Sequence, residues 1–280
     1  MQPLRFGVVS HTLTHETRPL LEEWLSLVGP HARMRLEVAY AHNYDTLATH
    51  LVEGFSPVAW VPPVVFLELE RHGLAVALTA HPRGANAHFC SVFITGDTSS
   101  LRTLASVPGA RVAWVERWSA SGYVVPRLSL FDEGIDPRVA FGGERFFGSH
   151  EAVVRAVIGG KADVGATYAS ADSFGRIVTG PWSNMTGAAE AIRVLAAWTE
   201  IPSDLIAIST RAPEHLRVPL ANAMVEVSAS GRGAALVRRI FGVDRMIPWA
   251  FESYEPLRTR ILRGAELGLL GALSEEPKNS

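Results

Sequence analysis

The chain has 280 residues, of which 48% are hydrophobic and 19% charged, enough core material for one large or two ordinary globular domains. Its formal net charge of -2 gives no electrostatic argument for a nucleic-acid partner or an anionic membrane surface. A single cysteine, Cys90, excludes an intrachain disulfide and a zinc site built from cysteines. No apolar run in the sequence reaches the length that spans a bilayer.

The first eighty residues alternate between strand-like and helix-like patterns. Strands are expected at 4–10, 35–41, 57–61 and 75–80, and helices at 17–29, 44–54 and 62–73. The first helix is expected to stop at Gly29-Pro30, and Gly54 is expected to cap the second. This β-α-β-α-β-α-β order favours an α/β fold with a mostly parallel sheet and helices on its faces.

The second part of the chain has its own βα pattern, between two long strands near residues 90 and 205. Further strands are expected at 88–96, 110–115, from Val139, at 162–168 and at 201–210, and helices from Ser119 to Phe131, at 149–158, 212–230, 231–242 and 253–273. The two long strands are natural crossings between two lobes. We therefore expect a discontinuous first lobe of residues 1–93 and 205–280, an inserted second lobe of 94–204, and a flexible tail at 274–280. A ligand cleft is expected between the lobes.

The stretch "RWSASGYVVPRL" has the chemistry of an anion site. The first turn of a helix has backbone N–H groups without partners, and its dipole places positive partial charge there. Ser119 and Ser121 would add hydroxyl donors, and Gly122 would keep the approach open. On the pattern alone, an ordinary serine N-cap explains the stretch better, because serine caps are common.

The stretch "FFGSHEAVVRAVIGGKADVGA" offers a second helix N-terminus, at Gly148-Ser149-His150. His150 would lie at the start of this helix, where its imidazole could donate to an anion. Alone, the same histidine is better explained as part of a capping turn.

Taken together, "SASGYVVPRLSLFDEGIDP", "VAFGGERFFGSHEAVVRAVIGGKADVGATYA" and "IPSDLIAIS" resemble the phosphonate/phosphite/phosphate-binding proteins of ABC importers. That family belongs to the type II periplasmic solute-binding proteins. The resemblance spans nearly the whole chain, with its specific part between Arg111 and Ser209. It implies a two-lobed α/β fold, each lobe a mixed, mostly parallel sheet flanked by helices.

The resemblance also implies a set of ligand-binding residues. In the family, a run of three hydroxyl residues and a glycine binds the phosphonate oxygens, and here that run is Ser119, Ala120, Ser121 and Gly122. The other residues of the implied set are His150, Tyr44 and Asp204. Two further ligand-binding candidates are His11, from its place in the loop after the first strand, and Tyr168. Asp204 lies in the "IPSD" motif, where the family's aspartate can pair with a ligand amine.

The sequence departs from the family pattern at several positions. Ala120 replaces one hydroxyl, and Ser170, with Asp172 two residues later, stands where aminophosphonate binders have a glutamate. The turn after the third strand is "WVPP", Trp60–Pro63, and Phe89 stands where the family has a tyrosine. Phosphite, a methylphosphonate-like anion, a sulfonate and a heteroaromatic small molecule therefore remain open as ligands.

No metal, cofactor or covalent chemistry is expected. His11 and His15 are four residues apart, but the glutamate of the H-E-x-x-H motif is absent and no third metal ligand is obvious. The common catalytic motifs are missing, so we expect a protein that is not an enzyme. Cys90 lies in the apolar run "HFCSVFIT" and is expected to be a buried, inert thiol.

The function expected from these residues is capture of a small anion, phosphonate-, phosphite- or phosphate-like, for an ABC-type importer. The expected partners are that ligand and an ABC permease, with no nucleic acid and a monomeric state. The alternatives are a cytoplasmic ligand sensor of the same fold that binds a different small molecule, and an enzyme on this fold. The resemblance implies a periplasmic location. The start of the chain has too short an apolar stretch for a signal peptide, which keeps a cytoplasmic location open.

Overall fold

The computed structural model describes residues 3–81, 88–172, 174–199, 201–229, 231–250, 252 and 254–270. Residue contacts divide the chain into two compact units. Unit 1 consists of Met1–Gly84 and Pro202–Tyr254, and unit 2 of Ala85–Ile201 and Glu255–Ser280. Both units are therefore discontinuous in sequence.

Unit 1 is built on a six-stranded sheet with the order β12-β4-β11-β3-β1-β2. Its strands are β1 Leu4–Val9, β2 Leu36–Ala41, β3 Val58–Val61, β4 Ala75–Ala80, β11 Leu205–Ser209 and β12 Ile247–Pro248. β1 is parallel to β2 and β3, while β11 inserts antiparallel between β3 and β4. The four strands of the first eighty residues thus run in one direction, as the sequence predicts, and the antiparallel strands β11 and β12 make the sheet mixed.

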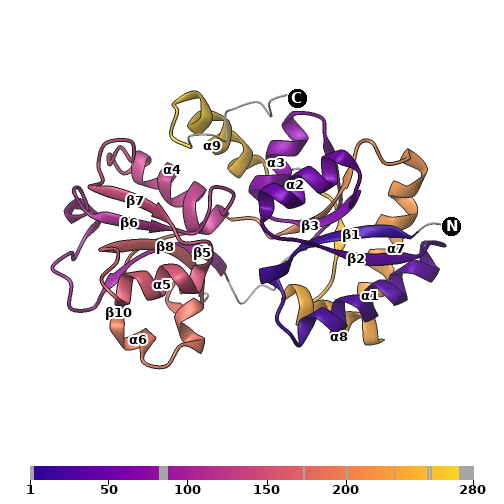
Figure 1. The fold of residues 1–280 in the computed structure, drawn as a ribbon, viewed down its shortest axis with the longest axis horizontal. Helices are drawn as coiled ribbons and strands as arrows, with labels where there is room; N and C mark the ends of the chain where they lie inside the picture. Colours follow the sequence, from indigo (N-terminus) through magenta and orange to yellow (C-terminus); the bar gives the residue numbers. More distant parts are fainter. Residues whose placement is uncertain are drawn as a thin grey trace. The chain divides into compact units, whose positions relative to one another are not determined.

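Helices cover both faces of this sheet. They are α1 Thr17–His31, α2 Tyr44–Glu53, α3 Pro63–Arg71, α7 Arg217–Ser228 and α8 Gly231–Phe241. In Figure 1, α2 and α3 lie on one face, and α1 and α8 lie on the other. Short 3-10 turns, Ser10–Thr12 and Glu214–Leu216, follow β1 and precede α7.

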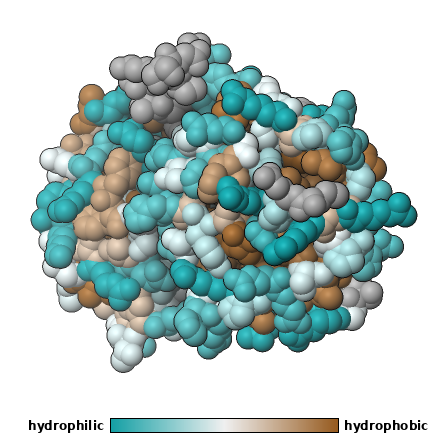
Figure 2. Space-filling model, turned by 45° about the vertical axis from the view of Figure 1, so that its right-hand side comes forward, coloured by the Kyte–Doolittle hydropathy of each residue, from teal (hydrophilic) through white to brown (hydrophobic). Residues whose placement is uncertain are grey.

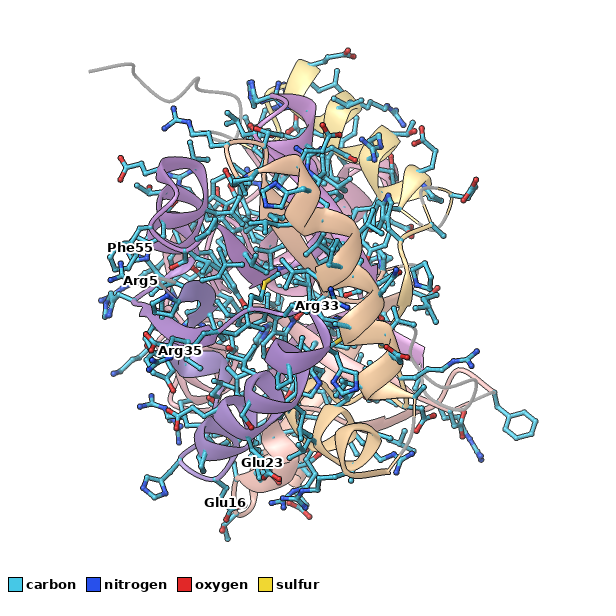
Figure 3. All side chains as sticks on the ribbon, turned by 90° about the vertical axis from the view of Figure 1, so that its right-hand side faces the viewer. Arg5, Glu16, Glu23, Arg33, Arg35 and Phe55 are labelled. Atoms are coloured by element: carbon cyan, nitrogen blue, oxygen red, sulfur yellow. The ribbon has the colours of Figure 1, made fainter. Side chains whose placement is uncertain are left out.

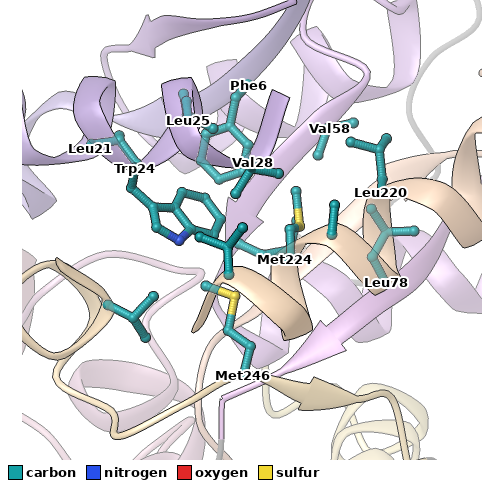
Figure 4. Packing of buried hydrophobic residues seen from close by; sticks show 14 of the residues in the cluster. Phe6, Leu21, Trp24, Leu25, Val28, Val58, Leu78, Leu220, Met224 and Met246 are labelled. Carbon is teal, nitrogen blue, oxygen red and sulfur yellow. The ribbon is translucent and has the colours of Figure 1, made fainter. Parts of the chain in front are cut away.

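The core between the sheet and helices α1, α7 and α8 is formed by large apolar side chains (Figure 4). The predicted apolar face of α1 supplies Trp24, which is fully buried and meets Phe6 of β1 edge to face, with ring centroids 6.0 Å apart. Met224 of α7 and Met246 close the same cluster. The helical spacing of α1 therefore identifies its buried face correctly.

Helix α1 continues to His31, beyond the predicted stop at Gly29-Pro30. Gly29 is required for another reason: a Cβ there would lie 2.7 Å from the carbonyl oxygen of Met34. The chain folds back at this point, and Met34 N–H donates to the Gly29 carbonyl at 2.9 Å. In contrast, Gly54 caps α2 in the left-handed conformation, at φ 80°, as predicted.

Unit 2 has a sheet with the order β10-β5-β8-β6-β7, with β9 paired to β8. The strands are β5 His88–Gly96, β6 Arg111–Trp114, β7 Gly143–Phe146, β8 Val164–Ala171, β9 Ile177–Thr179 and β10 Ile192–Trp198. β6 is parallel to β7 and β8, while β5 is antiparallel to β8 and β10. The strand expected from Val139 forms four residues later, at Gly143, and β10 is a strand that the sequence did not predict.

The helical segments of unit 2 are the 3-10 turns Leu104–Ser106 and Pro181–Asn184, the π turn Ala120–Val124, α4 Val125–Asp132, α5 His150–Ile158, α6 Ala188–Ala191 and α9 Glu255–Glu266. Figure 1 shows α4 on one face of the sheet and α5 with α6 on the other. Gly165 of β8 lets α5 approach, because a Cβ there would lie 2.6 Å from Val153 Cγ1.

The unit boundaries differ from the predicted lobes in two places. Strand β5 lies entirely in unit 2, because it pairs with β8 and β10 along its length, whereas a boundary at residue 93 would have cut it. Residues 255–280 belong to unit 2, whereas the sequence placed them in the first lobe. The reason is the packing of α9 on α4: Arg127 Nε donates to the Leu269 carbonyl at 2.8 Å, and Gly264 lies against Leu128. The predicted tail, 274–280, lies outside the described residues.

Figure 2 shows hydrophilic residues over most of the visible face, with smaller hydrophobic patches between them. On unit 1, the Arg5 guanidinium lies 4.3 Å from the centre of the Phe55 ring, and both are labelled in Figure 3. Glu23 of α1 pairs with Arg232 of α8 at 2.7 Å. None of the helices in the described ranges has the length and hydrophobicity of a transmembrane span.

Candidate ligand-binding site

The predicted anion-binding residues of unit 2 meet at one edge of its sheet. Because β6, β7 and β8 are parallel to one another, their carboxyl ends share an edge, the usual place for ligands in α/β sheets. Ser119 follows β6, His150 follows β7, and Tyr168 lies in the last half of β8. The structure therefore brings together residues that are up to 49 positions apart, from Ser119 to Tyr168.

Ser119 is the N-cap of the helical segment after β6. Its side-chain oxygen accepts from the Gly122 N–H at 3.0 Å, and its carbonyl accepts from the Val124 N–H at 3.0 Å. Gly122 is required by packing, since a Cβ there would lie 2.3 Å from Val115 Cγ2. The capping interpretation is thus correct for Ser119, and the Gly122 N–H is already used within the protein.

The segment begins with a π turn, where the sequence predicts an ordinary α-helix. Residues Ala120–Val124 form this turn and α4 continues from Val125. Pro126 has no N–H to give to the carbonyls of the preceding turn. Two other donors satisfy them: Ser91 Oγ donates to the Ser121 carbonyl at 2.7 Å, and Val115 N–H donates to the Gly122 carbonyl at 3.2 Å.

Ser121 has the features of a ligand donor. The residue is 3% exposed, and its hydroxyl has no hydrogen-bond partner within the described part of the chain. This oxygen is not one of the fully buried polar atoms that lack a partner, so it still reaches the surface, where a ligand can contact it. The N–H groups of Ala120 and Ser121 belong to the same first turn, and they have no acceptor among the described residues. Three donors therefore lie next to each other at the positive end of a helix.

His150 is the first residue of α5, and Ser149 caps that helix by accepting from the Ala152 N–H at 3.2 Å. The Nδ1 atom of His150 lies 2.9 Å from the hydroxyl of Thr167, a fully buried residue of β8. This bond orients the ring. When the threonine donates, the imidazole carries its proton on Nε2, where it can donate to an anion. Thr167 was missed in the sequence, although a hydroxyl in the small, apolar run "VGATYA" was a signal for it.

An aromatic stack lies beside these donors. The Tyr168 ring meets the His150 ring edge to face at 4.9 Å and stacks on Phe89 at 5.5 Å, with 20° between the planes. Burial, and then the negative charge of Glu151, raise the pKa of Tyr168. The phenol is therefore neutral at physiological pH, and this edge combines hydrogen-bond donors with an apolar surface.

The predicted residues of unit 1 also gather at one edge of their sheet, at the carboxyl ends of its parallel strands. His11 lies in the turn after β1, and Tyr44 begins α2 after β2; their rings meet edge to face at 5.9 Å. Asp204 directly precedes β11, whose first residue, Leu205, pairs with the last residues of β3 and β4. Asn43 caps α2 by accepting from the Thr46 N–H at 2.9 Å, which fixes the helix start at Tyr44.

Two of the departures from the family pattern now have a structural setting. Asp172 is held in the hairpin after β8, where it accepts from Arg176 Nε at 2.8 Å. The backbone N–H of Arg176 and its side chain lower the pKa of Asp172, so this carboxylate is already engaged. Pro62 and Pro63 form the start of α3, where proline is tolerated.

The thiol of Cys90 is fully buried and unpaired with another cysteine, as predicted, and burial raises its pKa. The described ranges contain no group of three or more His, Cys, Asp or Glu side chains placed to hold a metal ion.

Several solved structures share the fold of this chain. A Xanthomonas citri protein bound to ATP is 19% identical, with a TM-score of 0.75, and the match covers 95% of this chain and 99% of that one. The binding protein of an ABC phosphonate transporter from Pseudomonas aeruginosa is 18% identical, with a TM-score of 0.74 and coverages of 98% and 95%. PhnD1 of Prochlorococcus marinus, in complex with methylphosphonate, is 15% identical, with a TM-score of 0.73 and coverages of 95% and 98%.

These likenesses establish the periplasmic-binding-protein fold that the sequence predicts. No curated protein shows significant sequence similarity to the chain. A family model matches residues 6–254, which is most of the chain, and its description is "ABC transporter, phosphonate, periplasmic substrate-binding protein". This is a family of transport proteins and not of enzymes. The chain therefore belongs to the periplasmic substrate-binding proteins of ABC phosphonate transporters.

Proposed function

We propose that this solute-binding protein captures a small phosphonate-, phosphite- or phosphate-like oxyanion through the edge of unit 2 that carries Ser119–Gly122 and His150, and passes it to an ABC permease. The observation that carries the proposal is the hydroxyl of Ser121, a buried residue whose side-chain oxygen still reaches the surface and has no hydrogen-bond partner among the described residues. An anionic oxygen placed there would satisfy this hydroxyl together with the N–H groups of Ala120 and Ser121.

The character of the donors favours an oxyanion with one small apolar substituent. Ala120 provides an N–H but no hydroxyl, so the turn supplies fewer side-chain donors than a run of three hydroxyl residues would. The Phe89–Tyr168 stack provides apolar surface for a methyl or short alkyl group. Methylphosphonate fits both features, and the methylphosphonate complex of the similar Prochlorococcus protein supports this choice.

A ligand amine has less support. Ser170 stands where aminophosphonate binders have a glutamate. The next acidic residue along the chain is Asp172, and its carboxylate is already bonded to Arg176. Pairing of Asp204 with an amine stays a prediction, as do ligand contacts of His11, Tyr44 and Tyr168. We expect binding without turnover, because the one thiol is buried with a raised pKa and capture by preformed donors needs no covalent step.

Isothermal titration calorimetry with methylphosphonate, phosphite, phosphate and 2-aminoethylphosphonate tests the proposal. Methylphosphonate or phosphite should bind more tightly than 2-aminoethylphosphonate, and Ser121→Ala should weaken binding by about tenfold or more, the loss of one hydrogen bond to a charged group.

A matched control is Ser56→Ala in unit 1. Ser56 is fully buried and its hydroxyl also lacks a hydrogen-bond partner within the described residues, but it lies before β3, at the opposite end of that strand from the carboxyl edge. Its removal should leave binding unchanged. Equal affinities of the wild type and Ser121→Ala for every oxyanion would overturn the proposed site.

A further inference from the structure

The π turn at the start of the anion site needs an outside donor to keep its shape. We infer that Ser91, on the neighbouring strand β5, is a positioning residue that holds this turn in the geometry that receives the oxyanion. The predicted effect of Ser91 on ligand affinity rests on the proposed function. The hydrogen bond from Ser91 to the Ser121 carbonyl, in contrast, is present in the ligand-free protein.

Ser91 is well placed for this task. It is fully buried in the middle of β5, opposite Tyr168 of β8 in the antiparallel register. Its hydroxyl donates to the carbonyl oxygen of Ser121 at 2.7 Å, a short and therefore well-formed bond. Ser91 touches the turn through the backbone of the residue whose hydroxyl we assign to the ligand.

The hydrogen-bond pattern of the turn explains why the donor must come from elsewhere. In this turn the Val124 N–H donates to the Ser119 carbonyl, and the Val125 N–H donates to the Ala120 carbonyl. The next bond of the same series would run from residue 126 to the Ser121 carbonyl. Residue 126 is proline and has no N–H, so the series stops and the carbonyl depends on Ser91.

Removing the Ser91 hydroxyl would leave a buried carbonyl without a partner. A buried acceptor in that state is unfavourable, so the turn would rearrange to reach another donor or water. The peptide plane that carries the Ser121 carbonyl also carries the Gly122 N–H, which the Ser119 cap uses. A rotation of this plane would therefore disturb the cap and the direction of the Ser121 hydroxyl together. π turns of this kind occur often at functional sites.

The test compares Ser91→Ala with Thr95→Val. Thr95 lies four residues later on the same strand, is also fully buried, and donates through its hydroxyl to the Asp163 carbonyl at 2.8 Å. Both substitutions thus remove one buried hydroxyl-to-carbonyl bond from β5, but only Ser91 contacts the π turn.

The first readout is the rate of amide hydrogen exchange at Val124 and Val125 in the ligand-free protein, measured by NMR. In Ser91→Ala these two amides should exchange roughly tenfold faster than in the wild type, the effect of losing one hydrogen bond, whereas Thr95→Val should leave them unchanged. Unchanged exchange in Ser91→Ala, or equal acceleration in both variants, would overturn the inference.

The second readout is methylphosphonate affinity by calorimetry. Ser91→Ala should bind about tenfold more weakly, and Thr95→Val should bind like the wild type. Wild-type affinity of Ser91→Ala would overturn the positioning role even if exchange is faster. If the wild type itself binds no oxyanion, the proposed function fails, while the exchange experiment still decides whether Ser91 holds the turn.

Discussion

Ser119 and Ser121 are two residues apart, yet their hydroxyl groups have different partners. The Ser119 oxygen accepts a backbone N–H as the N-cap, whereas the Ser121 hydroxyl has no partner among the described residues. One hydroxyl therefore supports the fold and the other is available for a ligand. The sequence shows both serines but cannot distinguish their tasks, because the difference depends on the π turn and on Ser91.

This difference gives a paired prediction. Ser119→Ala should lower the free energy of unfolding by about 1 kcal/mol, the usual value of a serine cap, and also weaken binding. Ser121→Ala should leave unfolding nearly unchanged and weaken binding alone. Urea denaturation and calorimetry on both variants measure this. A loss of stability in Ser121→Ala as large as that in Ser119→Ala would contradict the assignment.

Arg127 is a second residue whose role depends on its surroundings. The side chain is buried, pairs with Glu144, and donates to the Leu269 carbonyl, while Glu144 also accepts from Trp114 Nε1 at 2.7 Å. The guanidinium lies 5.2 Å from the centre of the Tyr123 ring in the π turn. Arg127 therefore links β7, α4, the π turn and the segment after α9.

Arg127→Met should reduce the free energy of unfolding by about 3 kcal/mol, since it leaves the partly buried Glu144 carboxylate without its counter-ion. The double variant Arg127→Met/Glu144→Gln should recover part of this loss, because the glutamine can still accept from Trp114. Urea denaturation of the three proteins measures the coupling. Equal stability of the single and double variants would show that the ion pair does not account for the loss.

At the scale of elements, the approach of α5 to the sheet sets the position of His150. A Cβ on Gly165 would lie 2.6 Å from Val153 Cγ1 and 3.0 Å from Val157 Cγ2, both on α5. Gly165→Ala should therefore push α5 outward, destabilise unit 2 by about 1–3 kcal/mol, and weaken binding through the displaced His150.

Gly96→Ala is the matched control for this variant. Gly96 ends β5 in the same sheet, its φ is not positive, and a Cβ there would meet no atom within 4 Å. Chemical denaturation and calorimetry should show little change in this variant. Equal effects at both glycines would mean that close packing of α5 is not the cause.

The turn that contains Asp136 and Arg138 contacts the segment after α9, and its aspartate becomes protonated only at low pH. Arg138 bonds Asp136 and also donates to the Leu267 carbonyl at 2.8 Å. Hydrogen bonds from the side chain and then the backbone of Arg138 lower the pKa of Asp136 to about 2. Because the pKa is lower in the folded state, this carboxylate contributes stability that is present above pH 4 and is lost as the pH falls towards 2.

Asp136→Asn should therefore be less stable than the wild type at pH 5, and the difference should narrow near pH 2.5. Urea denaturation at the two pH values measures it. A difference that is independent of pH would show that the charge of Asp136 is not responsible.

Local sequence signals predicted some elements better than others. β4, β5 and the Gly54 cap of α2 form where the pattern places them, because hydrophobic runs and an obligatory glycine are local features. β7 was misplaced because "GERF" is polar and all four of its residues are exposed. The π turn was not predicted, because it depends on a contact with a strand about thirty residues away.

At the scale of the whole molecule, the resemblance predicted the fold class and the family, and the division into two discontinuous units follows the same plan. The placement of α9 was wrong because the sequence of an amphipathic helix does not show which surface it covers. For the proposed site, the sequence pointed to Ser121 and His150, whose ligand contacts stay predictions, but not to Ser91 and Thr167. Both are hydroxyl residues in apolar strands, and only the sheet register shows what they contact.

We propose that the N–H groups of Ala120 and Ser121, with the Ser121 hydroxyl, bind the oxyanion. Titration of the labelled protein with methylphosphonate, followed through the amide resonances of residues 119–124, tests it most directly. We expect large downfield shifts of the Ala120 and Ser121 amide protons at saturation, since each gains a charge-assisted hydrogen bond. Saturable binding that leaves both resonances in place would contradict it.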